Sequence, residues 1–263
     1  MNRQDYTVAD FLAIENPAQL LTDINRIIND NKKYVAQVTL AKKYYDNENG
    51  FAEVTEKRIN ELIADVESNP LRRADNQVPF NYHQILTDQK AAYLFGEMVL
   101  LKAMDSEGTD ISAFDEELMK FSKQLHRVLG VLSVEASNAG HGWAYAYINP
   151  EGDFRVVSLD AEEIIPVYDT TIEHRLMYVI RHYASGKSKI IEWYTPTGIL
   201  KWKDNKLADA GPLFMTGEAA GSWDHLPFVE FNNTPRKTDD LHKYKALIDV
   251  YDKTVSLYAN DIE

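Results

Sequence analysis

Side chains that often carry catalysis are present in this chain, but they lack the spacing of catalytic or metal sites. None of its seven histidines stands in an HExxH pattern or another metal-ligand spacing, so a metal site would have to be assembled by the tertiary fold. Gly186-Lys187-Ser188 is similar to the end of a phosphate-binding loop, but Arg181 stands where that motif requires glycine. A strand-like run follows instead of a helix, so we predict a hairpin turn.

Two other arrangements could do chemistry. The acidic group Asp160, Glu162 and Glu163 offers oxygen ligands for a cation or paired carboxylates for acid–base catalysis, but a charged loop between strands is the default interpretation. Ser137 lies near His141, but no GxSxG elbow surrounds it and no aspartate is placed to orient the histidine. We therefore expect no catalytic residue, no bound cofactor and no metal.

An aromatic row lies on one face of a predicted strand. Trp143, Tyr145 and Tyr147 alternate with smaller residues and could stack on sugars or bases, but such a row is more often half of the core of a sheet. Two alternative functions stay open here. One is a glycan-binding or other structural β module that uses this row and Trp193; the other is an enzyme that uses the acidic group with His141.

The segments that would position these residues change from helical to strand-like patterns near residue 140. Helical patterns begin at Pro17, which Asn16 can cap, and continue over Lys32–Tyr45, Glu53–Glu67, Phe80–Leu101 and from Ser112 to about Gly140. Strand-like runs follow a hairpin turn at 149–152 and cover Ile164–Tyr168, Leu176–Tyr183, Ser188–Tyr194, Gly198–Lys203 and Leu226–Phe231. We predict an α+β fold: a mainly helical part over 1–140, an antiparallel β part over 141–237 and a last helix over 238–263.

Two of the predicted helices have a clear apolar face. The first carries Leu20, Leu21, Ile24, Ile27 and Ile28. The helix predicted over Phe80–Leu101 carries Ile85, Ala92, Phe95 and Val99, with Leu86, Gly96 and Leu100 beside them. Packing in the core of the chain would explain both faces.

Composition narrows the class of protein. The chain has 263 residues, 28 Lys and Arg against 41 Asp and Glu, a formal charge of −13 and no cysteine. That balance argues against tight binding of nucleic acid, and the absence of cysteine excludes disulfides and thiolate chemistry. The N-terminus has no secretion signal, and the most apolar window, 91–104, is too short to span a bilayer. A soluble globular protein without a membrane partner is expected.

The most regular pattern is in the last helix. Apolar and aromatic residues recur there at heptad spacing, at Leu241, Tyr244, Ile248, Tyr251, Val255, Tyr258 and Ile262. Thr238, Asp239 and Asp240 signal its start. The sequence stops without a helix-ending signal, so we expect the natural protein to continue beyond Glu263. The seam residues are candidates for helix packing or subunit contact.

Several blocks in this order resemble the portal proteins of tailed bacteriophages, in the branch with long, non-contractile tails. They are Lys43-Tyr44-Tyr45-Asp46, Asn76-Gln-Val-Pro-Phe-Asn81, Asp88-Gln-Lys-Ala-Ala-Tyr-Leu-Phe-Gly-Glu97, Gly142-Trp-Ala-Tyr-Ala-Tyr147, Leu159-Asp-Ala-Glu-Glu-Ile-Ile-Pro-Val-Tyr168, Leu226-Pro-Phe-Val-Glu-Phe-Asn-Asn233 and Leu247-Ile-Asp-Val-Tyr-Asp-Lys253. Together they cover most of the chain from about Asp23 onward.

The resemblance implies a non-enzymatic head–tail connector subunit. Usually twelve copies form a ring at one capsid vertex, through which double-stranded DNA passes without sequence-specific binding. The helices and β region would form an outer wing, and the last helix would begin a stem; the clip, second stem helix, tunnel loop and crown of the family are absent from this sequence. Implied partners are the terminase, the scaffold or major capsid protein and the head-completion adaptor. The implied location is the virion, after assembly in the host cytoplasm.

An acidic balance also suits a conduit for DNA. Many Lys and Arg contacts to phosphates would bind the duplex and slow its movement, whereas repulsion keeps it moving. With the heptad seam assigned to packing, four other residues of the last helix could face the channel: Lys245, Asp249, Asp252 and Lys253.

Overall fold

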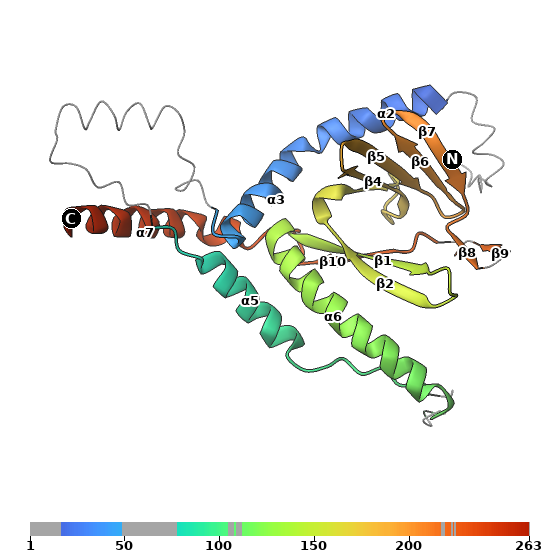
Figure 1. The fold of residues 1–263 in the computed structure, drawn as a ribbon, viewed down its shortest axis with the longest axis horizontal. Coiled ribbons are helices and arrows are strands. Elements are labelled where there is room, and N and C mark those ends of the chain that lie inside the picture. The colour runs from blue at the N-terminus through green and yellow to red at the C-terminus, as the bar shows by residue number, and fades with distance from the viewer. Residues whose placement is uncertain are drawn as a thin grey trace.

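A computed structural model of the chain describes residues 17–48, 78–104, 108, 112–216, 219–221, 223 and 225–262 (Figure 1). It has the predicted α+β composition, with helices at both ends of the chain and antiparallel sheets between them. The Asn16 cap and the helix predicted over Glu53–Glu67 lie outside the described residues.

The first helix, α2 (Pro17–Asp30), begins where the sequence predicts. Its predicted apolar face packs on the larger sheet, where Ile24 is 1% exposed and lies in one cluster with Ile180 and Ile191. Figure 1 shows α2 lying along this sheet. The 3.6-residue period of the apolar positions therefore identified the buried face correctly.

The second helix, α3 (Lys32–Tyr45), has the predicted bounds. It follows α2 after a single residue, and its buried residues belong to two different core clusters. Val38 lies in the core beneath the β region, and Ala41 and Tyr44 lie in a cluster with the last helix. This helix therefore links the sheets to the base of the last helix.

The third described helix, α5 (Tyr82–Phe95), is shorter than predicted, and most of its predicted core stripe is exposed, with Phe95 and Val99 half-buried. Ile85 and Leu86 are 43% and 45% exposed, whereas the buried positions are His83 and Thr87 on another face of the helix. The expectation that this apolar stripe packs in the core is therefore wrong within this chain. The reason is that the neighbouring helices form polar contacts with α5, described below.

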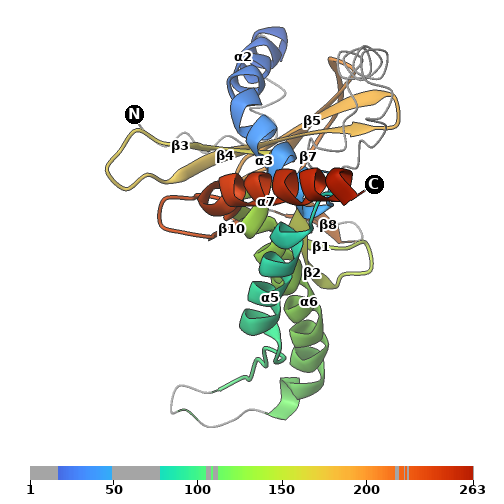
Figure 2. The same cartoon turned by 90° about the vertical axis from the view of Figure 1, so that its left-hand side faces the viewer.

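A longer helix, α6 (Asp115–Ala139), follows the short turn η1 (Ser112–Phe114) and lies alongside α5 (Figure 2). Three acids in its first turn suit the positive end of the helix dipole. It ends at Gly140, whose φ of 86° is the left-handed conformation that closes many helices. This is the predicted boundary between the helical and β parts.

The β region contains three antiparallel sheets in the described residues. The first has the order β10-β1-β2, the second β3-β4-β5-β6-β7, and the third β8-β9. Their bounds are β1 (His141–Ile148), β2 (Phe154–Leu159), β3 (Ile164–Tyr168) after the turn η2 (Ala161–Glu163), β4 (Leu176–Ser185), β5 (Ser188–Tyr194), β6 (Ile199–Lys203), β7 (Lys206–Gly211), β8 (Phe214–Thr216), β9 (Ala219–Gly221) and β10 (Phe228–Asn232).

Strand β10 returns from far along the chain to pair with β1, with Gly142 opposite Phe231 and Tyr145 opposite Phe228. The predicted strands are present, while β7, β8 and β9 were not predicted. Strand β7 reads Lys-Leu-Ala-Asp-Ala-Gly, which lacks the β-branched and aromatic residues that signal a strand. It pairs with the preceding strand, β6, in a hairpin at the edge of the second sheet.

The last helix, α7 (Leu241–Ile262), extends away from the sheets and from α6 (Figure 1). The carboxylate of Asp239 accepts a hydrogen bond of 2.6 Å from the His242 N–H, so the predicted acidic cap is formed. The chain at the beginning of α7, residues 240–249, lies against α3, α5 and α6, and this part is called the root below.

Candidate functional site

The acidic group is held by cations from elsewhere in the chain. Lys42 of α3 lies 2.8 Å from Glu162, 3.6 Å from Asp160 and 3.1 Å from Glu135 of α6. These pairs tie α3 to α6 and η2, which leaves no open carboxylate pair. Glu163 is bound 2.9 Å from Arg181. Among the described ranges, no group of three or more His, Asp or Glu could hold a metal ion.

Ser137 and His141 have separate partners. The Ser137 hydroxyl accepts a hydrogen bond of 3.2 Å from Lys90. His141 stacks on Tyr34 at 5.3 Å between ring centres, and its Nε2 lies 3.1 Å from the Tyr34 hydroxyl. Neither residue is arranged as a nucleophile with its base. Ser137 and His141 are therefore polar residues that pack inside the chain.

The aromatic row is part of the core. Trp143 is 1% exposed and lies in the cluster under the first sheet. Tyr145 packs on Tyr194 and Phe228, with ring centres 5.5 and 4.9 Å apart. Trp193 packs against the second core. The fully buried Trp143 cannot stack on a glycan, and Tyr145, Tyr147 and Trp193 are half-buried, so nothing in the described residues favours the glycan-binding alternative.

The root of α7 is built around a buried histidine. His83 of α5 is 0% exposed; its Nδ1 lies 2.7 Å from the Tyr244 hydroxyl of α7, and its Nε2 lies 2.8 Å from Oδ1 of Asn138 of α6. The Asn138 amide nitrogen donates to the Val134 carbonyl, which leaves Oδ1 to accept from Nε2–H and Nδ1 to accept from Tyr244. Burial lowers the pKa of His83, so the ring is neutral.

A second group of polar contacts fixes the start of α7. Asp240, 8% exposed, accepts hydrogen bonds from Lys90 of α5 at 2.7 Å, from Lys243 at 2.7 Å and from Asn233 at 3.1 Å. Its backbone N–H donates to the Ser137 carbonyl of α6 at 2.8 Å. Burial opposes ionisation, but the hydrogen bonds outweigh it and hold the pKa of Asp240 well below its usual range. A charged Asp240 therefore joins α5, α6 and α7.

The loop that leads into α7 passes very close to Gly140. A Cβ built at this position would lie 2.2 Å from the Lys237 carbonyl oxygen. The Asn233 N–H also donates to the Gly140 carbonyl at 3.0 Å. Glycine is required here both by the left-handed backbone and by this close approach. The end of α6 and the start of α7 are thus held together directly.

Segment 78–80 runs along the inner face of α7. The Phe80 N–H donates to the Asp252 carboxylate at 3.1 Å, and the Val78 N–H donates to the Ser256 hydroxyl at 3.0 Å. Asp252 is 0% exposed. It therefore cannot line a channel, and the prediction that Asp252 faces the lumen is wrong. The sequence shows an acidic residue at position 252, but it does not show that the distant Phe80 N–H donates a hydrogen bond to it in the folded chain.

The predicted heptad seam is covered near the root. Leu241 and Ile248 are 3% and 4% exposed and form a cluster with Tyr44 and the half-buried Tyr244. These three seam residues are packed within the chain, as the pattern indicated.

The distal half of the seam is more open. Tyr251 and Tyr258 are 41% and 68% exposed, and Val255 is half-buried. Tyr251 still packs edge-on against Phe80, with ring centres 5.0 Å apart. The side chain of Ile262 lies outside the described residues.

Comparison with known proteins gives the family. The family described as "Phage portal protein, SPP1 Gp6-like" matches residues 24–263. The chain belongs to this family of phage portal proteins. It is 32% identical over 266 residues to the portal protein of Clostridium phage phiCD119, covering 92% of this chain and 56% of that protein. It is 24% identical over 267 residues to the portal protein of Bacillus phage SPP1, covering 89% and 52%. The chain spans about half the length of the curated relatives it matches.

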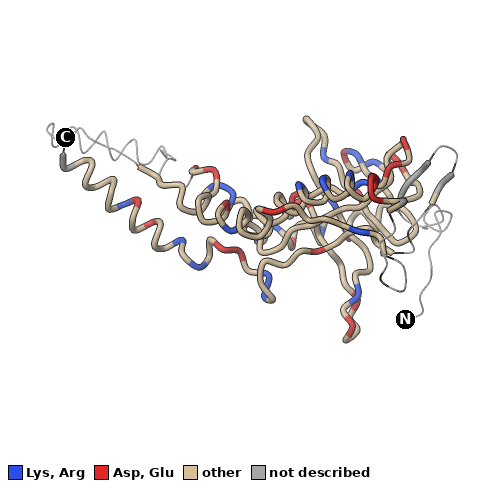
Figure 3. The backbone as a smooth tube through the Cα atoms, turned by 90° about the horizontal axis from the view of Figure 1, so that it is seen from below, with Lys and Arg blue, Asp and Glu red and all other residues tan. Residues whose placement is uncertain are grey.

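In this portal-family chain, the remaining channel candidates lie on one polar side of α7. Lys245 lies 2.6 Å from Asp249 and 5.1 Å from the centre of the Tyr44 ring, and the Tyr44 hydroxyl donates to Asp249. The side chains of Lys245 and Asp249 are 37% and 40% exposed, and Lys253 is exposed. Acidic and basic residues are interspersed along α7 (Figure 3).

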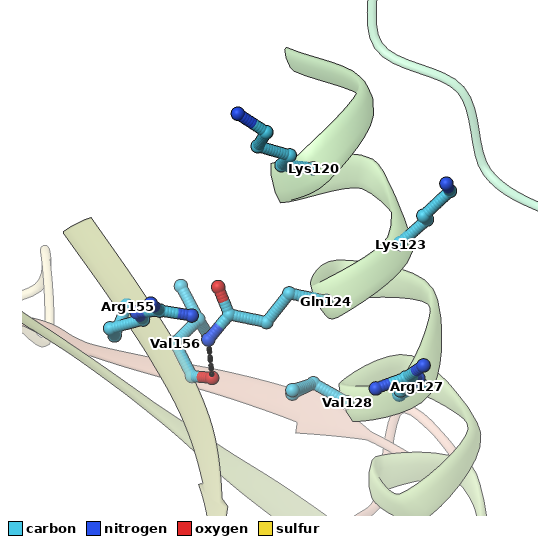
Figure 4. A pocket seen from close by; sticks show the side chains of 7 residues that line it. All are labelled: Lys120, Lys123, Gln124, Arg127, Val128, Arg155 and Val156. Carbon is cyan, nitrogen blue, oxygen red and sulfur yellow. Dashed lines mark hydrogen bonds between the residues drawn. The ribbon is translucent and has the colours of Figure 1, made fainter. Parts of the chain in front are cut away.

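A shallow groove between α6 and β2 is a feature that the sequence did not predict. It has a volume of about 450 Å³ and is lined by Lys120, Lys123, Gln124, Arg127, Val128, Arg155 and Val156 (Figure 4). Two of its cations are already paired with neighbours, at 2.8 Å for Lys120 and 2.7 Å for Arg155. The sequence did contain a signal for this groove, because Lys120, Lys123 and Arg127 are spaced i, i+3 and i+7 and therefore lie on one face of α6.

No helix in the described part of this portal-family chain is both long and apolar enough to cross a membrane.

Proposed function

We propose that this chain is part of a portal subunit that forms a ring at one capsid vertex and serves as a conduit for DNA during packaging and ejection. The observation that carries the proposal is the family match over residues 24–263. The root of α7 supports it, because buried hydrogen bonds to α5 and α6 hold this long helix in a fixed direction. A conduit needs such rigid walls.

The parts of the chain fit a wing and the start of a stem. In this proposal residues 1–140 form a mainly helical wing region, 141–237 form its antiparallel β part, and the stem begins at 238. The exposed length of α7 beyond the root supports this division. The family's clip, second stem helix, tunnel loop and crown would belong to parts of the protein outside this sequence.

The polar side of α7 is the best candidate for the channel wall. Lys245 and Asp249 form an ion pair and Lys253 is exposed, so this side carries mixed charge. Such a surface would pass duplex DNA without binding a particular sequence, because it lacks the clustered cations that hold phosphates. Asp252 is excluded from this wall by its burial.

The partners follow from the same proposal. About twelve copies would form the ring, and the terminase, the scaffold or major capsid protein and the head-completion adaptor would bind it. ATP hydrolysis would belong to the terminase, so the subunit itself is not an enzyme. Assembly would take place in the host cytoplasm, and the mature location would be the portal vertex of the virion.

Electron microscopy tests the ring directly. Negative-stain images of the protein at its natural length, with the 263-residue chain beside it, should show rings with a central hole for the natural form. Particles that stay monomeric at micromolar concentration, with scaffold protein present, would refute the portal function. The glycan alternative has no support in the buried Trp143.

A further inference from the structure

Helix α7 has a second apolar face that none of the described elements covers. Leu247, Val250 and Leu257 are 73%, 65% and 55% exposed. At about 100° per residue, they lie roughly opposite the packed side, and the exposed Tyr251 and Tyr258 border them. The three sides of α7 are therefore a packed side, a polar side and this open apolar side. An exposed apolar stripe of this length is typical of a protein contact.

Helix α5 has a matching open face. Ile85 and Leu86 are 43% and 45% exposed, and Tyr93 is 90% exposed. The apolar surface continues beyond the helix with Leu100 and Met104, 55% and 59% exposed. This is the stripe whose period predicts burial but which α6 and α7 of the same chain leave uncovered. Its sequence is that of a buried face, so another surface should cover it.

The charges beside the two faces are complementary. Asp88 and Glu97 lie beside the open face of α5, and both are exposed. Lys253 is exposed on α7, and it makes no ion pair with any described residue. Two copies of a chain with a net charge of −13 repel one another in general. A contact between copies therefore needs an apolar centre with opposite charges at its edge.

We infer that the open face of α7 of one copy packs on the open face of α5 of the next copy. The inference rests on the proposed ring in taking a second copy as the occupant. In a ring the two different faces meet head-to-tail, and a head-to-tail contact whose rotation closes repeats around the ring. A reciprocal dimer, in which each α7 packs on the α5 of the other copy, would stop the cross-linked series at the dimer and overturn the inference. The same contact would cover the side of α7 that faces away from segment 78–80.

The size of the two faces fits the centre of such a contact. A large apolar side chain has on the order of 100 Å² to bury. The five exposed side chains of α7 and the three of α5 then present roughly 500 Å² in total. A stable interface buries about 1,200–2,000 Å², with an apolar centre and a polar rim that supplies the remainder.

Engineered cysteines test this contact cleanly, because the chain has none of its own. The variants are Val250→Cys on α7, Tyr93→Cys on α5 and the double variant, each treated with a short bismaleimide. Tyr93 belongs to the end of α5 that points away from α7 (Figure 1), so a link within one chain is not expected. The double variant should give a series of dimers, trimers and larger species, and a mixture of the two single variants should give dimers only.

The control replaces the α7 cysteine by one on an unrelated exposed site. Ile172→Cys, at a side chain 103% exposed between β3 and β4, combined with Tyr93→Cys should give no series of bands. Dimers from Val250→Cys alone would show a symmetric α7–α7 contact and overturn the inference. Absence of any link in the double variant at high protein concentration would also overturn it. Circular dichroism confirms that each variant is folded.

Microscopy separates this inference from the proposed function. Rings without links between residues 93 and 250 would leave the portal function intact and refute this contact. Links without rings would support the contact and count against the ring. Cross-linking therefore tests the contact between α5 and α7, and the images test the ring, so either hypothesis can be refuted without the other.

Discussion

Replacing Asp240 by asparagine removes the charge that joins three helices at the root of α7. Its carboxylate lies 2.7 Å from both Lys90 and Lys243, and Asn233 donates to it as well. An asparagine has nearly the same shape but no charge, so the substitution leaves the packing in place. The substitution therefore measures the charge together with the acceptor oxygen that becomes an amide nitrogen.

The expected loss of unfolding free energy is about 2 kcal/mol. A hydrogen bond to a charged group contributes roughly 1.5–3 kcal/mol. The Lys90 and Lys243 side chains are 37% and 54% exposed, so solvent screens both pairs and the exposed Lys243 pair adds only about 0–1 kcal/mol. For a chain of this size, about 2 kcal/mol lowers the melting temperature by roughly 4–8 °C.

The pH dependence gives a second, sharper test. The folded pKa of Asp240 lies below its unfolded value, so its stabilisation is fully present above about pH 4 and is lost as the pH falls through the folded pKa. Urea unfolding of the natural chain and of Asp240→Asn should therefore differ most near neutral pH and converge in strong acid.

An exposed aspartate serves as the control. Asp209 on β7 is exposed, and Asp209→Asn should change the unfolding free energy by less than about 0.5 kcal/mol. If Asp240→Asn were as stable as this control at neutral pH, the account of the root would be wrong. A difference that stayed constant down to strong acid would point to packing instead of charge.

Three further substitutions test other parts of the structure. Gly140→Ala should lower the unfolding free energy by more than about 2 kcal/mol, because the added Cβ would lie 2.2 Å from a backbone oxygen. Gly152→Ala has a similar φ but open space around it, so it should lose only about 1 kcal/mol through backbone strain. Urea unfolding compares the two variants, and equal losses would contradict the close approach at Gly140. Trp143→Ala should lose about 3–5 kcal/mol, measured by thermal melting, whereas a folded variant of unchanged stability would place the tryptophan outside the core. Asp249→Lys should slow DNA packaging into empty capsids at low salt and less so at high salt, with Asp209→Lys as the control; unchanged packaging would argue against a channel position.

Local sequence patterns determined the elements with the strongest periodicity. Helix α3 has the predicted bounds, and α6 ends at the predicted glycine. The hairpin and five later strands also follow the alternation of apolar residues and turn signals. These features depend on backbone conformation and on neighbours within a few residues, so the sequence contains them directly. Strands β7 to β9 have weak local signals, and their pairing with a neighbouring strand defines them.

Only the tertiary structure decided which face of each helix is buried. Periodicity marks an apolar stripe but does not say what covers it: the stripe of α2 packs on the sheet, whereas that of α5 stays open because α5 turns His83 and Thr87 inward. Asp252 shows the converse, since the pattern assigned it to water but it is buried and accepts a hydrogen bond from the Phe80 N–H. Burial depends on partners brought together by the fold, and those partners are far away in sequence.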